Sequence, residues 1–282
     1  MDKNTLIGAL LIGAVLIGFT WFSKPDPTQS PAPSPQDTTQ LVTQAPAPVA
    51  GATSTDSASL DSLGAPVLPP YLQPTEERIV ELKNEKLSVK LSTKGGAPVE
   101  AVLADYLDQS KKPVHLFRKG DARLDLPLRT LENRLVSTAD ANFSVVESTD
   151  STAVLRMQID DVAYLDYAYK LRPADYRVDL VIRGHELRRF LPVNIALQDI
   201  EWTQRIPQQE QSWKFEGQYS GVYYHFPQGD VDRLETTSES SEDVQETLRW
   251  VAFKDKYFSS ALIASATGFK DNKLSIKAAK EG

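Results

Sequence analysis

The sequence contains no cysteine among its 282 residues. This absence excludes disulfide bonds, thiolate metal sites, cysteine nucleophiles and a lipid attached through an N-terminal cysteine. It leaves open which redox compartment the chain occupies.

Histidine is also scarce, and His115, His185 and His225 lie far apart in the sequence. None belongs to an H-E-x-x-H motif or an i, i+4 pair, so a zinc site is disfavoured. A G-x-S-x-G elbow, a Walker A loop and a G-x-G-x-x-G fingerprint are absent as well. The acidic pairs Asp160-Asp161 and Glu242-Asp243 are sequence neighbours, which point to opposite faces of a strand and are not preassembled as glycosidase carboxylates. We therefore predict no catalytic residue, no metal ligand and no cofactor.

The chain has fewer basic than acidic residues, with 31 Lys and Arg against 38 Asp and Glu. The formal net charge is −7 and the pI is about 5.1. Nucleic-acid binding relies on Lys and Arg that neutralise phosphates, so we do not expect a nucleic-acid partner. With 41% hydrophobic and 24% charged residues, the chain has room for one domain of about 200 residues with a real core.

Lys and Arg are missing altogether from residues 25–77, where Ala, Ser, Thr and Gln predominate. Between Lys24 and Pro74 lie 11 of the 18 prolines. Such a stretch cannot bury enough apolar surface to offset its chain entropy. We predict a flexible linker over residues 24–75, with a root-mean-square span of roughly 40 Å.

The one long apolar run lies at the start of the chain, from Thr5 to Phe22. At a helical rise of ~1.5 Å per residue it measures ~27 Å, close to the ~30 Å hydrocarbon core of a bilayer. A cleaved signal peptide is the alternative, but only Lys3 precedes the run, and the bulky Trp21-Phe22 ends it where a peptidase needs small residues. We predict an uncleaved transmembrane anchor over residues 1–23, in contact with lipid. Lys3 and Lys24 flank it equally, so they do not set its orientation. Its apolar and aromatic residues are Leu6, Ile7, Leu10, Leu11, Val15, Leu16, Ile17, Phe19, Trp21 and Phe22.

Beyond residue 76 the hydrophobic pattern has a period of two, which is typical of half-buried strands. Leu87, Val89 and Leu91 alternate with polar residues, and Gly95-Gly96 predicts a tight turn before a partner strand over Val99–Tyr106. We predict an all-β fold, a large antiparallel β-sandwich formed by residues 76–282 as one domain. Further strands are expected over Ala153–Ile159, Tyr167–Leu171, Tyr176–Ile182 and Val193–Leu197, and residues Ser241–Leu248 are read as a helical turn, a strand or a loop.

The densest aromatic segment runs from Trp213 to Phe226. One interpretation is a stacking platform for a sugar or an extended polypeptide, because aromatic faces bind both. The other is a pair of core strands, with Trp213 and Phe215 on one face and Val222, Tyr224 and Phe226 on another. The candidate binding residues are Trp213, Tyr219, Tyr223 and Tyr224. Residues Trp250–Phe258 are open to the same two readings, a partner surface or two core strands that meet at Lys254-Asp255-Lys256.

Several of these segments together resemble a YidC-type membrane protein insertase of Bacteroidetes-like Gram-negative bacteria. The opening Met1–Thr5 is followed at once by the apolar run and Trp21-Phe22, as in that family. The other similar stretches are Leu91–Leu103, Tyr169–Arg172 with Asp175–Val178, and Arg249–Ile263. The most specific piece is Trp250–Phe258, within the last of these stretches.

The resemblance implies an inner-membrane protein with a cytoplasmic N-terminus, one crossing, a periplasmic β-supersandwich domain and then five further transmembrane helices. Members of the family insert and fold inner-membrane proteins, alone or beside the Sec translocon. No segment after Phe22 approaches 18 apolar residues, so this chain departs from the full family pattern. We therefore expect the N-terminal part of an insertase chaperone, a non-catalytic periplasmic module that contacts membrane-protein clients, lipid and Sec components.

Two alternatives stay open from the sequence. The first is a membrane-tethered periplasmic carbohydrate-binding or carbohydrate-modifying β-sandwich protein, because large β-sandwiches also serve sugar enzymes. The second is a purely structural envelope protein with no translocation partner.

Overall fold

The computed structural model describes residues 68–193, 198–210, 212–235, 239–265 and 267–277. The predicted anchor and the predicted linker up to residue 67 lie outside this part of the chain. Among the described residues, none of the helices has the length and apolar character needed to cross a bilayer.

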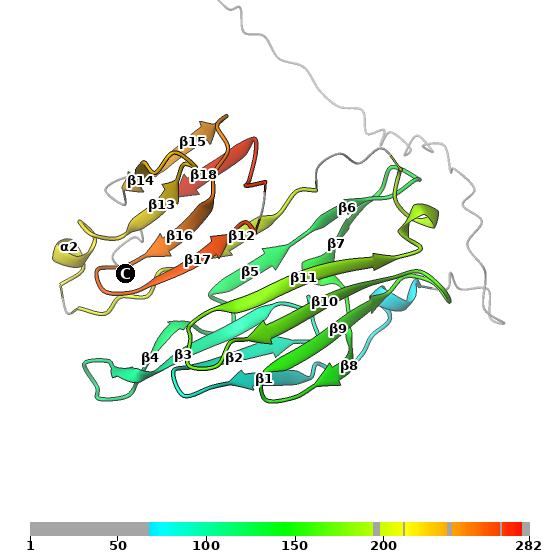
Figure 1. The fold of residues 1–282 in the computed structure, drawn as a ribbon, viewed down its shortest axis with the longest axis horizontal. Helices are drawn as coiled ribbons and strands as arrows, with labels where there is room; N and C mark the ends of the chain where they lie inside the picture. The colour runs from blue at the N-terminus through cyan, green and yellow to red at the C-terminus, as the bar shows by residue number, and fades with distance from the viewer. Residues whose placement is uncertain (1–67, 194–197, 211, 236–238, 266, 278–282) are drawn as a thin grey trace, which may run out of the picture. The chain divides into compact units, whose positions relative to one another are not determined.

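The first antiparallel sheet contains four strands in the order β1-β2-β3-β4 (Figure 1). In β2, Leu87, Val89 and Leu91 point into the core as their alternation predicts. Gly95 and Gly96 adopt φ values of +81° and +65° in the β2–β3 connection, which confirms the predicted turn. The strands are β1 (Ile79–Lys83), β2 (Leu87–Ser92), β3 (Pro98–Leu107) and β4 (Pro113–Phe117).

The second antiparallel sheet has the order β11-β10-β9-β8. Its strands are β8 (Ser144–Ser148), β9 (Thr152–Gln158), β10 (Tyr164–Leu171) and β11 (Val178–His185). Leu82 and Leu91 from the first sheet and Leu155 and Met157 from the second are fully buried in one shared cluster. The two sheets therefore pack face to face, and each buried leucine contributes about 2 kcal/mol.

Two tyrosines of β10 cross this core and end in hydrogen bonds. Tyr169 donates its hydroxyl to the Gly96 carbonyl at 2.8 Å, and Tyr167 donates to Thr138 Oγ1 at 3.1 Å. Burial raises the pKa of Tyr167 to about 12. The hydroxyl groups are satisfied, so the rings contribute their apolar area at no polar cost.

Short elements connect the two sheets with the C-terminal strands. β5 (Ala122–Asp125) pairs with β12 (Glu201–Gln204), and β6 (Pro127–Arg129) pairs with β7 (Leu135–Ser137). Single 3₁₀ turns are η1 (Pro70–Leu72), η2 (Thr138–Asp140) and η3 (Leu187–Arg189). β12 is thus the strand by which the later part of the chain joins the earlier part.

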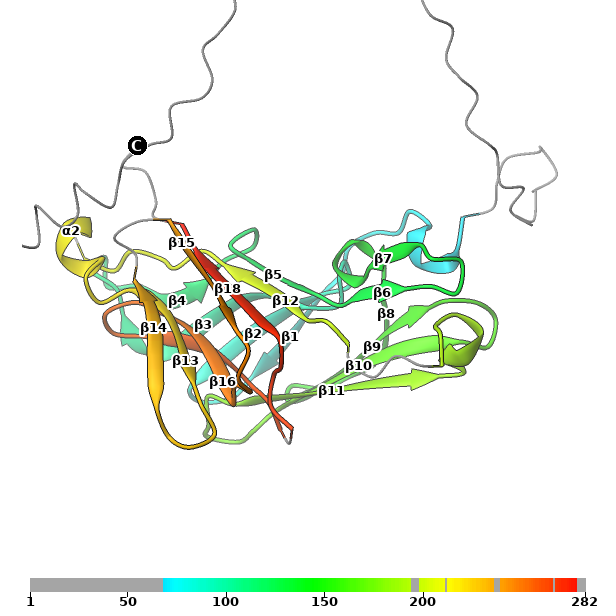
Figure 2. The ribbon, with the colours of Figure 1, turned by 90° about the horizontal axis from the view of Figure 1, so that it is seen from above.

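The C-terminal residues form a third sheet in the order β14-β13-β16-β17, with the pair β15-β18 against it (Figure 2). Val222, Leu234 and Ile276 form one small core between them, and Tyr224, Val244 and Leu248 form another. The strands are β13 (Gly221–His225), β14 (Val231–Glu235), β15 (Ser240–Val244), β16 (Trp250–Lys254), β17 (Ser259–Ile263) and β18 (Asn272–Ile276), and the short helix α2 covers Trp213–Glu216.

The prediction of an all-antiparallel β fold is confirmed. The segment 250–258 contains one strand, β16, and the turn that follows it; the second strand, β17, begins only at Ser259, so the reading of two strands within this segment is right for the first of them alone. The prediction of a core strand over Trp213 and Phe215 is wrong. Ser212 accepts the backbone N–H groups of Phe215 and Glu216 at 3.2 and 3.1 Å and starts a helical turn there instead. The predicted strand Val193–Leu197 falls mainly on residues 194–197, outside the described residues.

Candidate functional site

Tyr223 and Tyr224 are neighbours on β13 and therefore point to opposite faces of the third sheet. Tyr224 is only 1% exposed and donates its hydroxyl to Glu242 at 2.8 Å. Burial raises its pKa, and hydrogen bonding to the Glu242 carboxylate raises it further. Tyr224 is a core residue, so its ring faces are covered and it does not belong to a binding surface.

Tyr223 and Tyr219, in contrast, are brought together near the surface. Tyr223 donates its hydroxyl to the Tyr219 carbonyl at 3.4 Å and accepts a hydrogen bond from Arg233 at 2.8 Å. The Lys254 ammonium lies 5.5 Å from the centre of the Tyr223 ring. Trp213 begins α2, and its side chain lies outside the described part of the structure. Of the four predicted binding residues, the structure therefore brings Tyr219 and Tyr223 into contact.

A lysine lies among three exposed aromatic rings beside them. The Lys256 ammonium is 4.5 Å from the ring centre of Phe215, 5.9 Å from that of Tyr219 and 4.8 Å from that of Tyr257. Each of these rings is 43–53% exposed. We call Phe215, Tyr219, Tyr223, Lys256 and Tyr257 the tyrosine–lysine surface. Lys256 and Tyr257 belong to the segment Trp250–Phe258, for which a partner surface was one of the two sequence readings. The sequence did not indicate that they lie beside Phe215 and Tyr219, because the two segments are far apart along the chain.

Two buried carboxylates hold this surface in place. Glu216, 1% exposed, accepts the backbone N–H of Gln209 at 2.9 and 3.0 Å and that of Glu210 at 2.8 Å. Asp255, 3% exposed, accepts the backbone N–H of Tyr257 at 2.7 Å within the β16–β17 turn. Glu210 in turn accepts hydrogen bonds from Lys256, at 3.1 Å, and from the Tyr257 hydroxyl. Charge-assisted hydrogen bonds therefore position Lys256 and Tyr257, while the Phe215 and Tyr219 rings contact each other edge to face, with their centres 5.6 Å apart.

The same face of the third sheet carries a further apolar row. The strand registers place Ile263 opposite Trp250, Trp250 opposite His225, and His225 opposite Val231. The His225 and Trp250 rings stack with their centres 5.3 Å apart, and Ile263 and Val231 at the two ends are 55% and 53% exposed. His225 is two residues from Tyr223, so this row lies on the same side of the sheet.

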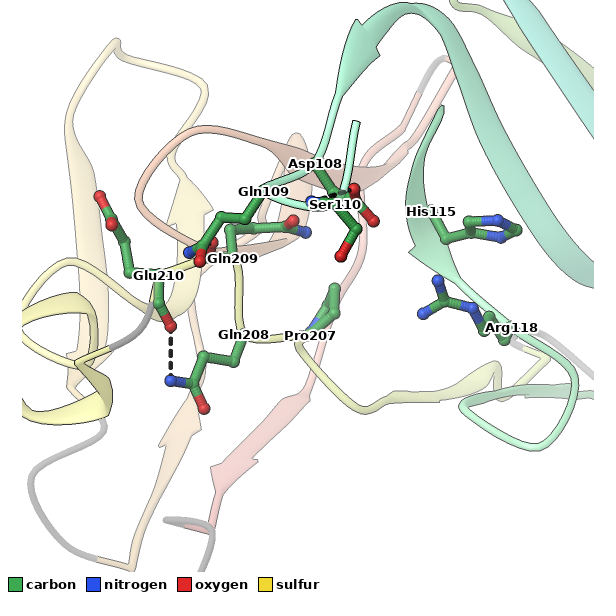
Figure 3. A pocket seen from close by; sticks show the side chains of 9 residues that line it. All are labelled: Asp108, Gln109, Ser110, His115, Arg118, Pro207, Gln208, Gln209 and Glu210. Atoms are coloured by element: carbon green, nitrogen blue, oxygen red, sulfur yellow. Dashed lines mark hydrogen bonds between the residues drawn. The ribbon is translucent and has the colours of Figure 1, made fainter. Parts of the chain in front are cut away.

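A polar cavity of about 280 Å³ lies next to Glu210 (Figure 3). Asp108, His115 and Arg118 reach it from the β3–β4 hairpin, while Gln208 and Glu210 reach it from the segment after β12. Its lining is nearly all polar, unlike the largely apolar pockets that hold small organic ligands. Among the residues that the structure describes, no cluster of three or more His, Asp or Glu could hold a metal ion. The cavity is suited to water and polar groups.

His115, which lines this cavity, is expected to make the stability of the chain depend on pH. Burial lowers its pKa from 6.5, and the Arg118 guanidinium lowers it further, while Glu100 opposes the shift. Its Nδ1 atom is buried and has no hydrogen-bond partner among the described residues. Because the folded chain then binds this proton less tightly than the unfolded chain, stability is expected to fall as the pH drops through 6.5 toward the folded pKa. An NMR titration should place the His115 midpoint below 6.5, and His115→Gln should flatten the change of urea midpoint over that range. Equal slopes in the two proteins would contradict the prediction.

The family model and the relatives that match this chain carry the same family description. A family model described as YidC periplasmic domain matches residues 79–281. A membrane protein insertase YidC of Porphyromonas gingivalis is 44% identical over 294 residues, which cover 100% of this chain and 46% of that protein. Proteins with the same description from Parabacteroides distasonis and Bacteroides fragilis are 34% and 32% identical, again over 100% of this chain and 47% and 46% of their own lengths. The chain spans about half the length of the curated relatives it matches.

Proposed function

Because the chain belongs to the YidC family of membrane protein insertases, we propose that it is the N-terminal part of a machine that inserts and folds inner-membrane proteins. The observation that carries this proposal is the 44% identity to an insertase over the whole chain. The insertase relatives do not favour the carbohydrate-binding alternative.

The proposed arrangement has three parts. Residues 1–23 form the transmembrane anchor with a cytoplasmic N-terminus, residues 24–75 form a linker, and residues 76–282 form a periplasmic β-supersandwich domain at the bacterial inner membrane. The apolar run, the prolines and the match of the periplasmic family model to residues 79–281 support it.

The domain acts by binding and needs neither a catalytic residue nor a cofactor. Its proposed partners are nascent membrane-protein clients and components of the Sec translocon. The tyrosine–lysine surface supports this role, because exposed rings around a cation bind the backbone and side chains of a polypeptide that leaves the membrane.

Site-specific photocrosslinking in cells tests the proposal. A photoreactive amino acid is placed at Tyr219 of the full-length protein, with exposed Glu147 on β8 as the control position. We expect adducts between position 219 and a membrane-protein client arrested during translation, and at least several-fold fewer at position 147. The absence of client or translocon adducts from both positions would contradict the proposed function.

The genomic sequence beyond Gly282 offers an independent check. An insertase predicts several apolar spans of about 20 residues downstream. A stop codon directly after Gly282 would contradict it.

A further inference from the structure

The outer edge of β11 carries unpaired backbone groups. β11 is eight residues long and ends the second sheet. Its ladder with β10 continues into the bond from the Arg172 N–H to the Arg177 carbonyl, at 3.1 Å. Hydrogen-bonded pairs alternate in an antiparallel ladder, so Asp179, Val181, Arg183 and His185 bond to β10. The backbone groups of Val178, Leu180, Ile182 and Gly184 therefore point outward.

No hydrogen bond joins these outward groups to any described residue. The side chains of the same residues lie at the margin of the core. Leu180 and Ile182 are half-buried, whereas their partners on β10, Tyr169 and Tyr167, are 3% and 0% exposed. Side chains are therefore less buried on β11 than on β10. One added strand would pair with the outward backbone groups of β11 and would also cover the exposed parts of Leu180 and Ile182.

Other edges of the described sheets carry features that oppose pairing. β8 has a bulge between Val145 and Glu147, and β1 places charged Glu81 and Lys83 on its exposed face. β17 is uncharged but has only five residues. β11 has neither a bulge nor a proline, and it is the longest of these edges.

We propose that the β11 edge binds an extended segment of another polypeptide, in antiparallel register about Val181. The outward residues from Val178 to Gly184 span ~20 Å, enough for a segment of about seven residues. Asp179 and Arg183 lie on the exposed face, four residues apart, and Val181 between them is 47% exposed. The segment that fits has apolar residues opposite Leu180 and Ile182 and an acid opposite Arg183. A base opposite Asp179 adds to the fit, although the Asp179 carboxylate already accepts two hydrogen bonds from Arg172, at 2.8 and 2.9 Å.

A single extended segment fits this edge better than a second folded copy. Figures 1 and 2 both show β16 of the third sheet near one end of β11. A second copy would have to bring its own third sheet into that space, whereas one strand needs only the width of a strand, about 4.8 Å.

The sequence of β11 is itself a suitable probe. In an antiparallel pair centred on Val181, a peptide copy of residues 178–185 places its aspartate opposite Arg183, its arginine opposite Asp179 and its isoleucine opposite Leu180. A second peptide, with the aspartate and arginine exchanged, has the same composition and places like charges opposite each other.

The first experiment measures binding of the labelled peptide to the full chain in mild detergent by fluorescence anisotropy. Ile182→Pro removes an outward N–H without breaking the β10 ladder, and Ile182→Ala is the matched control that keeps it. We expect at least tenfold weaker binding for Ile182→Pro and less than fivefold for Ile182→Ala. The charge-exchanged peptide should bind more weakly than the original, and Arg183→Asp should abolish that preference, because each peptide then makes one favourable and one unfavourable charge pair. Equal affinities of the proline and alanine variants would overturn the proposal.

The second experiment uses the absence of cysteine and does not depend on a proline variant that folds. Residue 181 and its counterpart in the peptide form a non-hydrogen-bonded pair with Cα atoms about 4.5 Å apart, within the range of a disulfide. Val181→Cys should therefore form a disulfide with a peptide whose central valine is cysteine, at least tenfold more than Val146→Cys on β8, where Val146 is 52% exposed. Equal yields, or a covalent dimer of the Val181→Cys chain in place of the peptide adduct, would overturn it. The inference rests on the proposed function only for where the bound segment comes from. Both experiments use the purified chain, so they test binding at the β11 edge independently of any insertase activity.

Discussion

Replacing Glu216 with alanine is expected to lower the free energy of unfolding by about 3 kcal/mol. The Glu216 carboxylate is 1% exposed and accepts the backbone N–H groups of Gln209 and Glu210. Alanine leaves both half-buried donors without their carboxylate partner, at roughly 1–3 kcal/mol each, and opens a small cavity. Because the carboxylate fixes the segment that carries Glu210, the same change should release Lys256 and Tyr257 from their shared acceptor.

The measurement is urea unfolding of Glu216→Ala beside Glu216→Gln. Glutamine keeps the volume and one acceptor oxygen, so it should cost about 1 kcal/mol. Tyr257 chemical shifts should change in the alanine variant and stay near their original values in the glutamine variant. A loss below ~1 kcal/mol for alanine would show that these hydrogen bonds do not hold the surface.

Gly95→Ala is expected to cost about 2–3 kcal/mol. Gly95 has φ +81°, and a Cβ there would lie 2.8 Å from the Ala139 carbonyl oxygen. Alanine therefore meets left-handed backbone strain, of about 1 kcal/mol, and a clash with backbone that has to shift. The expected result is a lower urea midpoint and loss of the bond from the Gly95 N–H to the Ala141 carbonyl, now 2.8 Å.

Gly120→Ala separates the two causes. Gly120 has φ +92° but nothing lies within 4 Å of the added Cβ, so only the backbone strain applies. It should cost about 1 kcal/mol, roughly half or less of the Gly95 effect. Equal losses at the two positions would show that the close approach to Ala139 does not contribute.

Structural features could be predicted from the sequence where neighbouring residues determine them. The alternation of Leu87, Val89 and Leu91 and the Gly95-Gly96 turn are local, and both were predictable from period and turn chemistry. The opposite faces of Tyr223 and Tyr224 also follow from strand geometry, so the two could not both belong to one binding surface. Only the structure shows that Tyr224 is the buried one.

The tyrosine–lysine surface was not predictable in the same way. Phe215 and Tyr257 are distant in the sequence, and Lys256 reaches both only because the β16–β17 turn lies beside α2. Glu216 is a charged residue in a polar segment, and no pattern distinguishes it from a solvated glutamate. Its burial depends on backbone donors from another segment.

The way the chain joins its two halves has an evolutionary consequence. Strands β1 to β11 come from one continuous stretch and β13 to β18 from another, and β12 alone returns to pair with β5. Mutations in residues 212–277 can therefore remodel the third sheet and its rings while the core of the first two sheets keeps its sequence, except at Phe258, which packs against that core and against Tyr106. Relatives can therefore diverge in the third sheet, at positions that do not contact the first two sheets, at little cost to folding of the rest.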